Sequence, residues 1–268
     1  GHVRMTPVQA RALPPMLQGH DALVQAPTGS GKTVAFGLAV LQALDVTRIG
    51  VQALVLCPTR ELAEQVARTL RRLATGLPNA KLLTLTGGVP LAPHLASLTH
   101  PPHVAVGTPG RILELVEKGA LDLAPVGTVV LDEADRMLDM GFEDALRAIL
   151  KATPRQRRTL LFSATYPDAI RDIARASMRE PFEISVEGEA QAPAIEQRFV
   201  EADAARKPAT LAALLVDEGD ASAVVFCNMR RDVDEVAGSL AHLGFSALAL
   251  HGEMEQRDRE EVLVRFAN

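Results

Sequence analysis

Six short apolar runs alternate with helical patterns in the first part of the sequence. Between two of them, ELAEQVARTLRRLA places Leu62, Val66, Leu70 and Leu73 on one helical face. Strands that alternate with helices form βαβ units, and nearly continuous apolar strands are typical of a parallel sheet covered on both faces. The sequence therefore predicts an α/β fold. The runs are DALVQ (21–25), VQALVLC (51–57), AKLLTL (80–85), HVAVG (103–107), GTVVLD (127–132) and TLLFSA (159–164).

The chain is long enough for one complete domain of this kind and part of a second. It has 268 residues, and single cores stop growing at about 250–300 residues. The segment VEGEAQAPAI (186–195) interrupts the alternation with Gly, Ala, Pro and acidic residues, as linkers do. We therefore predict a first domain at 1–187, a linker at 188–196 and an incomplete second domain at 197–268. Further strands are predicted in IEQRFVEA (195–202), ASAVVFCN (221–228) and FSALALHG (245–252).

Composition excludes several classes of protein. No stretch of 18 apolar residues free of charge occurs, so no membrane span is expected. The N-terminal residues GHVRMTPVQA lack the basic-then-apolar pattern of a signal peptide, and both cysteines, Cys57 and Cys227, lie inside apolar runs. We expect buried thiols rather than a disulfide, in a protein of the reducing cytoplasm. Separately, we expect a monomer.

Charge and aromatic content limit how the chain could hold a nucleic acid. Lys and Arg number 28 against 33 Asp and Glu, which gives a net charge of −5 and no global basic field. Eight Phe, one Tyr and no Trp disfavour the stacking of successive bases on rings. The basic cluster RQRR at 155–158 fits a solvated loop better than a specific contact. Any nucleic acid would be held locally, through its backbone.

The segment APTGSGKT (26–33) directly follows the first apolar run and precedes the helical pattern VAFGLAVLQAL. This is the setting of a phosphate-binding loop, in which glycines let the backbone curl and the helix N-terminus faces the anion. Lys32 would reach the outer phosphates, and Thr33 would supply a hydroxyl to Mg²⁺. Ala26 stands where the generic pattern has its first glycine. The residues expected to bind a nucleotide here are Ala26, Pro27, Thr28, Gly29, Ser30, Gly31, Lys32 and Thr33.

Three carboxylates occupy four positions in VVLDEADRML (129–138). Asp132 ends an apolar strand, the position from which nucleotide hydrolases with such a loop hold Mg²⁺. Glu133 could orient and deprotonate the attacking water. An acidic turn that caps the next helix through Asp135 is the alternative, but it accounts for only one of the three. We predict catalytic roles for Glu133, Asp132 and Lys32, with Thr33 and Asp132 as Mg²⁺ ligands, Asp132 through water.

These residues resemble the motifs of DEAD-box ATP-dependent RNA helicases of superfamily 2, whose motif II is spelled DEAD and stands here at 132–135. The resemblance covers the whole chain, and the motifs follow the family's order. TPVQ (6–9) is similar to the Q motif, which implies that Gln9 reads the adenine edge; a Gln amide can pair with adenine's donor and acceptor. SAT (163–165) implies that Ser163, Thr165 and Asp135 couple the nucleotide site to RNA binding.

The same resemblance implies contacts with the RNA backbone. PTREL (58–62), the Gly87-Gly88 pair and TPGR (108–111) each follow a predicted strand, at the edge where parallel sheets bind ligands. Helix caps are an equally good account of the threonines, whereas the arginines offer phosphate donors. Beyond the linker, AVVFCN, HG (251–252) and QRDR (256–259) are similar to motifs of a second RecA-like domain. The implied RNA contacts are Pro58, Thr59, Arg60, Gly87, Gly88, Thr108, Pro109, Arg111, Gln256 and Arg259.

The resemblance implies two RecA-like parallel-sheet domains of the P-loop NTPase class, the second one truncated. The aromatic residue that the family places upstream of the Q motif, and motifs V and VI with their arginine fingers, have no counterpart in these 268 residues. Such fingers contribute about 10³- to 10⁵-fold to phosphoryl transfer. We therefore expect this chain by itself to bind nucleotide weakly and to hydrolyse it poorly.

The resulting prediction is an ATP-dependent RNA helicase that uses ATP and Mg²⁺ to separate short RNA duplexes. The runs DEADRMLDMGF and MEQRDREEVLVRFAN are most similar to the bacterial DbpA-type branch, which implies ribosomal RNA of the large subunit as the partner. Two alternatives stay open: a nucleotide-controlled RNA clamp with little unwinding, and a DNA-acting helicase of the same superfamily. The intact SAT motif favours unwinding, and a preference for RNA would rest on 2′-OH contacts.

Overall fold

The computed structural model describes residues 4–186, 196–219 and 221–267. Its contacts divide the chain into two units, residues 1–193 and 194–268. The predicted linker at 188–196 lies outside the described residues except for its last position. Within the described ranges, none of the helices has the length and apolar character needed to cross a membrane.

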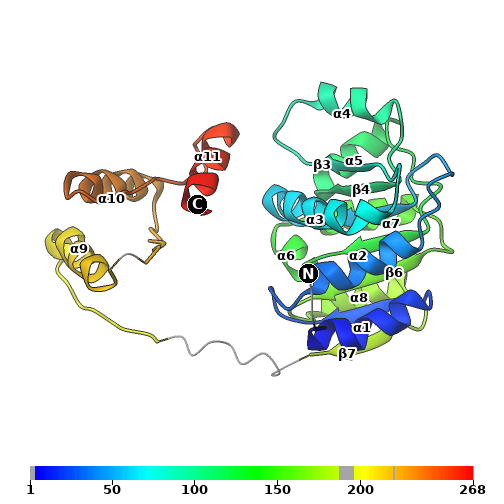
Figure 1. Cartoon of the computed structure of the whole chain (residues 1–268), viewed down its shortest axis with the longest axis horizontal. Helices are drawn as coiled ribbons and strands as arrows, with labels where there is room; N and C mark the ends of the chain where they lie inside the picture. The colour runs from blue at the N-terminus through cyan, green and yellow to red at the C-terminus, as the bar shows by residue number, and fades with distance from the viewer. Residues whose placement is uncertain (1–3, 187–195, 220, 268) are drawn as a thin grey trace. The chain divides into compact units, whose positions relative to one another are not determined.

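In the described part of the first unit, seven strands form one sheet in the order β3-β4-β2-β5-β6-β1-β7, and every neighbouring pair is parallel (Figure 1). Six of these strands coincide with the six apolar runs, so the predicted α/β parallel sheet is confirmed. The edge strand β7 was not anticipated, because an exposed edge leaves only a weak apolar pattern in FEIS. The strands are β1 (Ala22–Gln25), β2 (Ala53–Leu56), β3 (Leu82–Leu85), β4 (Val104–Gly107), β5 (Thr128–Leu131), β6 (Arg158–Ser163) and β7 (Phe182–Ser185).

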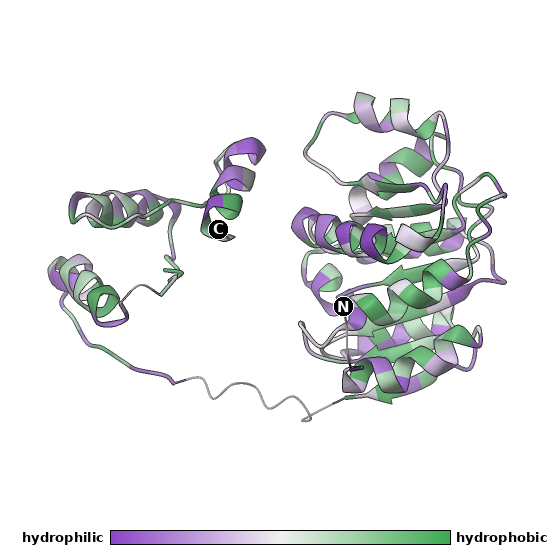
Figure 2. Cartoon of the chain, in the orientation of Figure 1, coloured by the Kyte–Doolittle hydropathy of each residue, from purple (hydrophilic) through white to green (hydrophobic). Residues whose placement is uncertain are grey.

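Helices cover both faces of this sheet. In β2, Ala53 and Val55 belong to the core shared with α1, α2 and α3, whereas Leu54 and Leu56 belong to the core shared with α5 to α8. Because successive strand residues point to opposite faces, both sets must be apolar, and strands near the middle of the sheet are hydrophobic in Figure 2. The helices are α1 (Pro7–Leu17), α2 (Lys32–Gln42), α3 (Arg60–Leu73), η1 (Ala74–Gly76), α4 (Leu91–Leu98), α5 (Pro109–Glu117), α6 (Ala134–Asp139), α7 (Glu143–Ala152) and α8 (Asp168–Ser177).

The basic cluster at 155–158 differs from the expected solvated loop. Arg155 is exposed, but Arg157 and Arg158 are buried. The Arg158 guanidinium donates hydrogen bonds to the carbonyl oxygens of Met16 (2.6 Å) and Ala39 (2.9 Å) and to Thr128 Oγ1 (3.1 Å). The sequence prediction was wrong for Arg158 because β6 begins at this residue, and its side chain joins α1, α2 and β5 at the amino end of the sheet.

The second unit contains η2 (Ala204–Arg206), α9 (Lys207–Asp217), α10 (Arg230–His242) and α11 (Gln256–Ala267). Among residues 196–219 and 221–267 no strand is formed, so the strands predicted in this region are wrong for the described residues. An apolar pattern favours extended backbone, but a strand also needs a hydrogen-bonded neighbour. These segments lack that ladder, and Phe199 and Phe226 are 93% and 92% exposed. Both cysteines are free thiols and Cys57 is buried as expected, but Cys227 is only half-buried because its segment forms no strand in a covered sheet.

Candidate functional site

Six predicted motifs of the first unit meet at the carboxyl edge of the sheet. The phosphate loop follows β1, the DEAD carboxylates follow β5 and SAT follows β6; these three strands are neighbours in the sheet. PTREL, Gly87-Gly88 and TPGR follow β2, β3 and β4, which are also neighbours. The edge therefore has a nucleotide half and a proposed RNA half, which meet between β5 and β2. Ligands bind at this edge in open parallel sheets.

Two glycines give the phosphate loop its shape. Gly29 and Gly31 have φ angles of 81° and 90°, in the left-handed region that side chains disfavour. A Cβ atom at Gly31 would also lie 2.6 Å from Gln9 Nε2, so the close approach of α1 requires glycine there. Gly31 precedes α2, and no side chain caps that helix. Its first N–H groups therefore have no capping side chain, as an anion site at a helix N-terminus requires.

Gln9 is buried and holds α1 against the phosphate loop. Its Oε1 accepts a hydrogen bond from Thr6 N (3.0 Å), and its backbone N donates to Thr6 Oγ1 (3.4 Å), which completes a capping box. Its Nε2 donates to the carbonyl oxygen of Gly31 (3.1 Å). An amide oxygen has a second lone pair and an amide nitrogen a second hydrogen, so Gln9 keeps the capacity to pair with an adenine edge.

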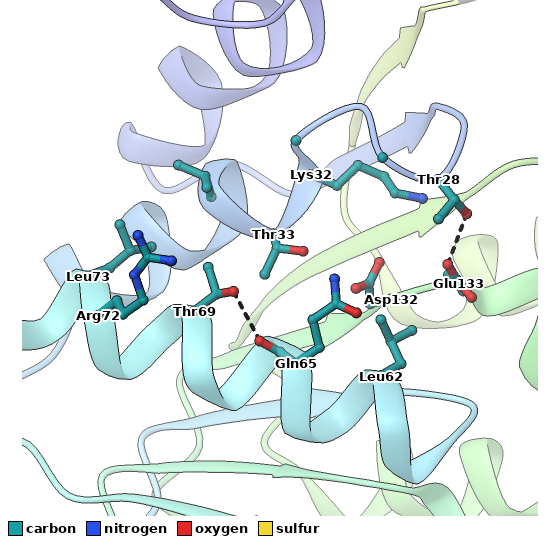
Figure 3. A pocket seen from close by; sticks show the side chains of 13 residues that line it. Thr28, Lys32, Thr33, Leu62, Gln65, Thr69, Arg72, Leu73, Asp132 and Glu133 are labelled. Atoms are coloured by element: carbon teal, nitrogen blue, oxygen red, sulfur yellow. Dashed lines mark hydrogen bonds between the residues drawn. The ribbon is translucent and has the colours of Figure 1, made fainter. Parts of the chain in front are cut away.

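A pocket of about 390 Å³ lies between the phosphate loop, the carboxylates after β5 and helix α3 (Figure 3). Lys32 is buried in its wall and donates a hydrogen bond to the carbonyl oxygen of Ala26 (3.2 Å). The sequence interpretation missed the contribution of α3. The sequence feature that could have revealed this contribution is a set of residues at helical spacing, which fall on one face of α3. The α3 residues that line the pocket are Leu62, Gln65, Thr69, Arg72 and Leu73.

Asp132 is the most deeply buried carboxylate of the pocket. Its backbone N donates to the carbonyl oxygen of Leu56 (2.9 Å), and its Oδ1 has no hydrogen-bond partner. Burial raises the pKa of Asp132 to about 6, although nearby Lys32 lowers it and Glu133 raises it further. A buried, unpaired carboxylate is unfavourable unless a cation compensates it.

These residues fit a hydrated Mg²⁺ bound to nucleotide phosphates. No group of three or more His, Cys, Asp or Glu side chains among the described residues could hold a metal by itself. Mg²⁺ keeps several waters and is commonly held by one or two protein ligands together with substrate phosphates. Asp132 Oδ1 offers an unpaired acceptor, and the Thr33 hydroxyl lines the same pocket.

Glu133 adopts an unusual backbone conformation that directs it toward the phosphate loop. Its φ and ψ angles are both 55°, in the left-handed region, and it immediately precedes α6. Such a residue in this region costs roughly 1 kcal/mol or more, and functional sites are where this strain concentrates. Its Oε1 accepts a hydrogen bond from Thr28 Oγ1 (3.0 Å). The structure thus joins a carboxylate after β5 to the loop after β1.

Asp135 binds the SAT segment through one carboxylate oxygen. Its Oδ2 accepts hydrogen bonds from Ala164 N (3.1 Å), Thr165 N (2.9 Å) and Thr165 Oγ1 (3.0 Å), while its backbone N donates to Ser163 Oγ (3.2 Å). Partial burial raises the pKa of Asp135, but the hydrogen bonds with Thr165, Arg136 and Ser163 together outweigh it, and the pKa lies below its ordinary value. The structure therefore brings together all three residues that were expected to couple the site.

The threonines of the proposed RNA half play different local roles. Thr59 caps α3 by accepting a hydrogen bond from Leu62 N (3.2 Å), as the alternative account allowed. Thr108 does not cap α5; its Oγ1 accepts from Gly87 N (3.3 Å) and so links the segments after β3 and β4. Gly88 has a φ angle of 69°, and a Cβ there would overlap the Arg60 guanidinium.

Arg111 is buried and already engaged. Its Nη2 donates to the carbonyl oxygen of Val89 (2.8 Å), and its Nη1 lies 2.6 Å from His94 Nδ1. Its Nε lies 3.0 Å from Glu114 Oε2, at ion-pair distance but without hydrogen-bond geometry. Burial first, and then the Arg111 charge, lowers the pKa of His94, whereas Glu114 raises it. A contact between Arg111 and a phosphate would require it to exchange one of these partners.

Two further residues with a proposed RNA role lie in the second unit. Gln256 begins α11, and Arg259 lies one turn later on the same helix. Arg259 Nη1 donates a hydrogen bond to Gln256 Oε1 (3.4 Å). The pair is therefore locally ordered on one helix.

Comparison with known families and proteins gives consistent matches over both units. The model of the DEAD/DEAH box helicase family matches residues 6–173, and that of the helicase conserved C-terminal domain matches residues 206–268. The crystal structure of a DEAD box protein from the hyperthermophile Methanococcus jannaschii aligns with a TM-score of 0.66 and 37% identity. It covers 98% of this chain and 70% of that one.

Two curated relatives are similar over almost the whole chain. The ATP-dependent RNA helicase DbpA of Escherichia coli (strain K12) is 53% identical over 268 residues, which are 100% of this chain and 59% of that protein. The DEAD-box ATP-dependent RNA helicase CshA of Geobacillus kaustophilus is 43% identical over 267 residues, which are 99% of this chain and 57% of that protein. The chain therefore spans less than two thirds of the length of either relative.

Proposed function

The chain belongs to the DEAD/DEAH box helicase family, and on this premise we propose that the whole protein is an ATP-dependent RNA helicase that separates short RNA duplexes locally. One observation carries the proposal. Asp132 is buried with an unpaired Oδ1 in a pocket that also contains Lys32 and the glycine-shaped phosphate loop. This combination is suited to a nucleoside triphosphate with Mg²⁺ and is difficult to explain as a purely structural feature.

The proposed hydrolysis assigns one task to each group. The loop N–H groups and Lys32 bind the phosphates, and Gln9 pairs with the adenine edge. Thr33 and Asp132 would hold Mg²⁺, Asp132 through water, and the ion would supply positive charge that neutralises the phosphates. Glu133 orients the attacking water and accepts its proton at the carboxylate. Thr28 positions that carboxylate through its hydrogen bond to Oε1.

The proposed coupling to RNA runs through Asp135. Asp135 follows Asp132 and Glu133 within one turn, and its carboxylate binds the backbone and side chain of Thr165. A change at the nucleotide pocket would therefore act on the SAT segment through three hydrogen bonds to one oxygen. Segments after the neighbouring strands β2, β3 and β4 would hold the RNA backbone, with Arg60 and Arg111 as phosphate donors.

We further propose that the protein is a cytoplasmic monomer and that its partner is ribosomal RNA. This finer assignment rests on the resemblance to the DbpA-type branch and on 53% identity to DbpA of Escherichia coli. A nucleotide-controlled RNA clamp and a DNA-acting helicase are the competing functions. The network between Asp135 and the SAT segment favours unwinding over the clamp, because a clamp has less need of a link between hydrolysis and the RNA edge.

Strand separation tests the proposal. The whole protein is mixed with a short RNA duplex that carries one labelled strand, and released strand is followed with ATP and with a non-hydrolysable analogue. We expect repeated separation with ATP, and none with ATP after Lys32→Ala. RNA binding without additional separation in ATP would identify the clamp. Competition between RNA and DNA of equal sequence distinguishes the DNA-acting alternative, which predicts no preference for RNA.

A further inference from the structure

Helix α3 contributes one continuous stripe to the nucleotide pocket. Leu62, Gln65, Thr69 and Arg72 line the pocket at intervals of three or four residues, so they lie on one face of the helix. The opposite side of α3 is buried against the sheet through Ala63, Val66, Ala67 and Leu70. The stripe therefore faces the phosphate loop across the pocket, as Figure 3 shows.

Within this stripe, the Gln65 side chain points toward Thr33 and Asp132 (Figure 3). The backbone carbonyl oxygen of Gln65 accepts a hydrogen bond from Thr69 Oγ1 (3.0 Å). The side-chain carboxamide of Gln65 forms no hydrogen bond within the described residues. Its amide oxygen and nitrogen are therefore both available to a ligand. The helix that carries them is held in place by its buried residues and by the Thr59 cap.

The neighbouring groups of the stripe fit the role of an acceptor less well. Leu62 has no polar atom. The Thr69 hydroxyl oxygen can still accept a hydrogen bond, but its orientation is set by the proton that it donates to the backbone of Gln65. Arg72 has donors only, so it cannot accept a hydrogen bond from water bound to a cation. Gln65 is therefore the best-placed acceptor of α3, because its side chain extends toward Thr33 and Asp132 and its carboxamide forms no hydrogen bond within the described residues (Figure 3).

We propose that Gln65 is a positioning residue that accepts a hydrogen bond from a water of the Mg²⁺ hydration shell. Mg²⁺ retains several waters, and each metal-bound water presents hydrogens that need acceptors. Residues that orient the ligands of a metal in this way change its affinity by about 10- to 100-fold when they are removed. This inference rests on the proposed nucleotide site and adds a third protein group to Thr33 and Asp132.

The test measures metal binding rather than hydrolysis. Mn²⁺ replaces Mg²⁺, and its affinity for the ADP-bound protein is determined from the electron paramagnetic resonance signal of free Mn²⁺. We expect Gln65→Leu, which keeps the side-chain size but removes the acceptor, to weaken Mn²⁺ binding about 10-fold. ADP affinity measured in EDTA should stay within about twofold of the wild type, because the change concerns only the hydrated cation.

Two further variants make the result specific. Gln65→Glu keeps an acceptor oxygen at the same length and should restore Mn²⁺ affinity to the wild-type value or above it. Glu64→Ala lies one residue earlier on α3, outside the pocket lining, and should leave Mn²⁺ affinity unchanged. Wild-type Mn²⁺ affinity in Gln65→Leu, or an equal loss in Glu64→Ala, would overturn the inference. A whole wild-type protein that binds no ADP would instead contradict the proposed nucleotide site itself.

Discussion

Thr28 Oγ1 donates a hydrogen bond to Glu133 Oε1 over 3.0 Å and so connects the phosphate loop to the carboxylate that follows β5. Glu133 also has a left-handed backbone with a φ angle of 55°. Two independent features, one of the backbone and one of the side chain, therefore fix the position of this carboxylate. A group that must receive a proton from a bound water benefits from such a fixed position.

Thr28→Val is expected to lower the single-turnover rate of ATP hydrolysis by the whole protein about fivefold. A hydrogen bond of this kind contributes about 1 kcal/mol, and about 1.4 kcal/mol corresponds to a factor of ten in rate. ATP affinity should change less than about twofold, because the backbone N–H groups that hold phosphates remain. Thr28→Ser keeps the hydroxyl and serves as the control. A rate for Thr28→Val equal to that of Thr28→Ser would show that the hydrogen bond has no part in hydrolysis.

Asp132→Asn is expected to stabilise the nucleotide-free protein near neutral pH. The unfolded chain ionises Asp132 at about 3.8 and the folded chain at about 6, so stability falls as pH rises between these values. Above about pH 6 the full cost is on the order of 3 kcal/mol, since one pKa unit corresponds to about 1.36 kcal/mol.

The measurement is urea-induced unfolding of wild type and Asp132→Asn in the absence of nucleotide and metal. The stabilisation should be largest at about pH 7.5 and about half as large at about pH 5, because the wild-type carboxyl is then mostly protonated when folded. The same variant should lose the metal dependence of nucleotide binding. Equal or lower stability of the variant at about pH 7.5 would mean that another group already compensates the Asp132 charge.

The central sheet was predictable because the apolar composition of each strand is visible in the sequence of that strand alone. Both faces of β2 and β5 are buried, so their apolar residues are continuous and visible without any knowledge of neighbours. The same reasoning failed in the second unit, where Val224, Val225 and Phe226 have the composition of a strand but no hydrogen-bonded partner among the described residues. Strand pairing is a tertiary property that local composition cannot supply.

Likewise, only part of the candidate site was predictable from the sequence. The phosphate loop was predictable because its glycines and Lys32 are adjacent in the chain, and their roles depend on local backbone geometry. The α3 stripe was not predicted, because Gln65 reaches the pocket only after the sheet places β1 and β2 with two strands between them. Arg111 was expected at the ligand-binding edge, but its engagement with His94 and Val89 depends on how α4 and its preceding loop fold back.

Asp135→Asn is expected to lower the stability of the first unit by about 1 kcal/mol at neutral pH. The carboxylate accepts hydrogen bonds from Ala164 N and from both donors of Thr165, and an amide oxygen accepts them more weakly. The partial exposure of Asp135 keeps the expected value small. Because the pKa of Asp135 is lowered on folding, its contribution is present above about pH 4 and is lost as pH falls through the folded pKa.

Thermal unfolding of the wild type, Asp135→Asn and Asp144→Asn tests this prediction. Asp144 lies in the first turn of α7 and makes no hydrogen bond to the SAT segment, so its variant controls for the loss of one negative charge. The destabilisation should be specific to Asp135→Asn. An Asp135→Asn protein as stable as the wild type at neutral pH would show that the network with Thr165 contributes no net free energy.

Arg158→Met is expected to destabilise the protein by about 2–3 kcal/mol. Methionine fills a similar volume, but it leaves the buried carbonyl oxygen of Ala39 without its Arg158 donor and that of Met16 with only Gly19 N, and an unsatisfied buried group costs about 1–3 kcal/mol. Arg155→Met, at an exposed position in the same basic cluster, should change stability by less than about 0.5 kcal/mol. Urea unfolding of the three proteins gives the comparison. Similar midpoints for the two variants would show that Arg158 does not stabilise the junction of α1, α2 and β5.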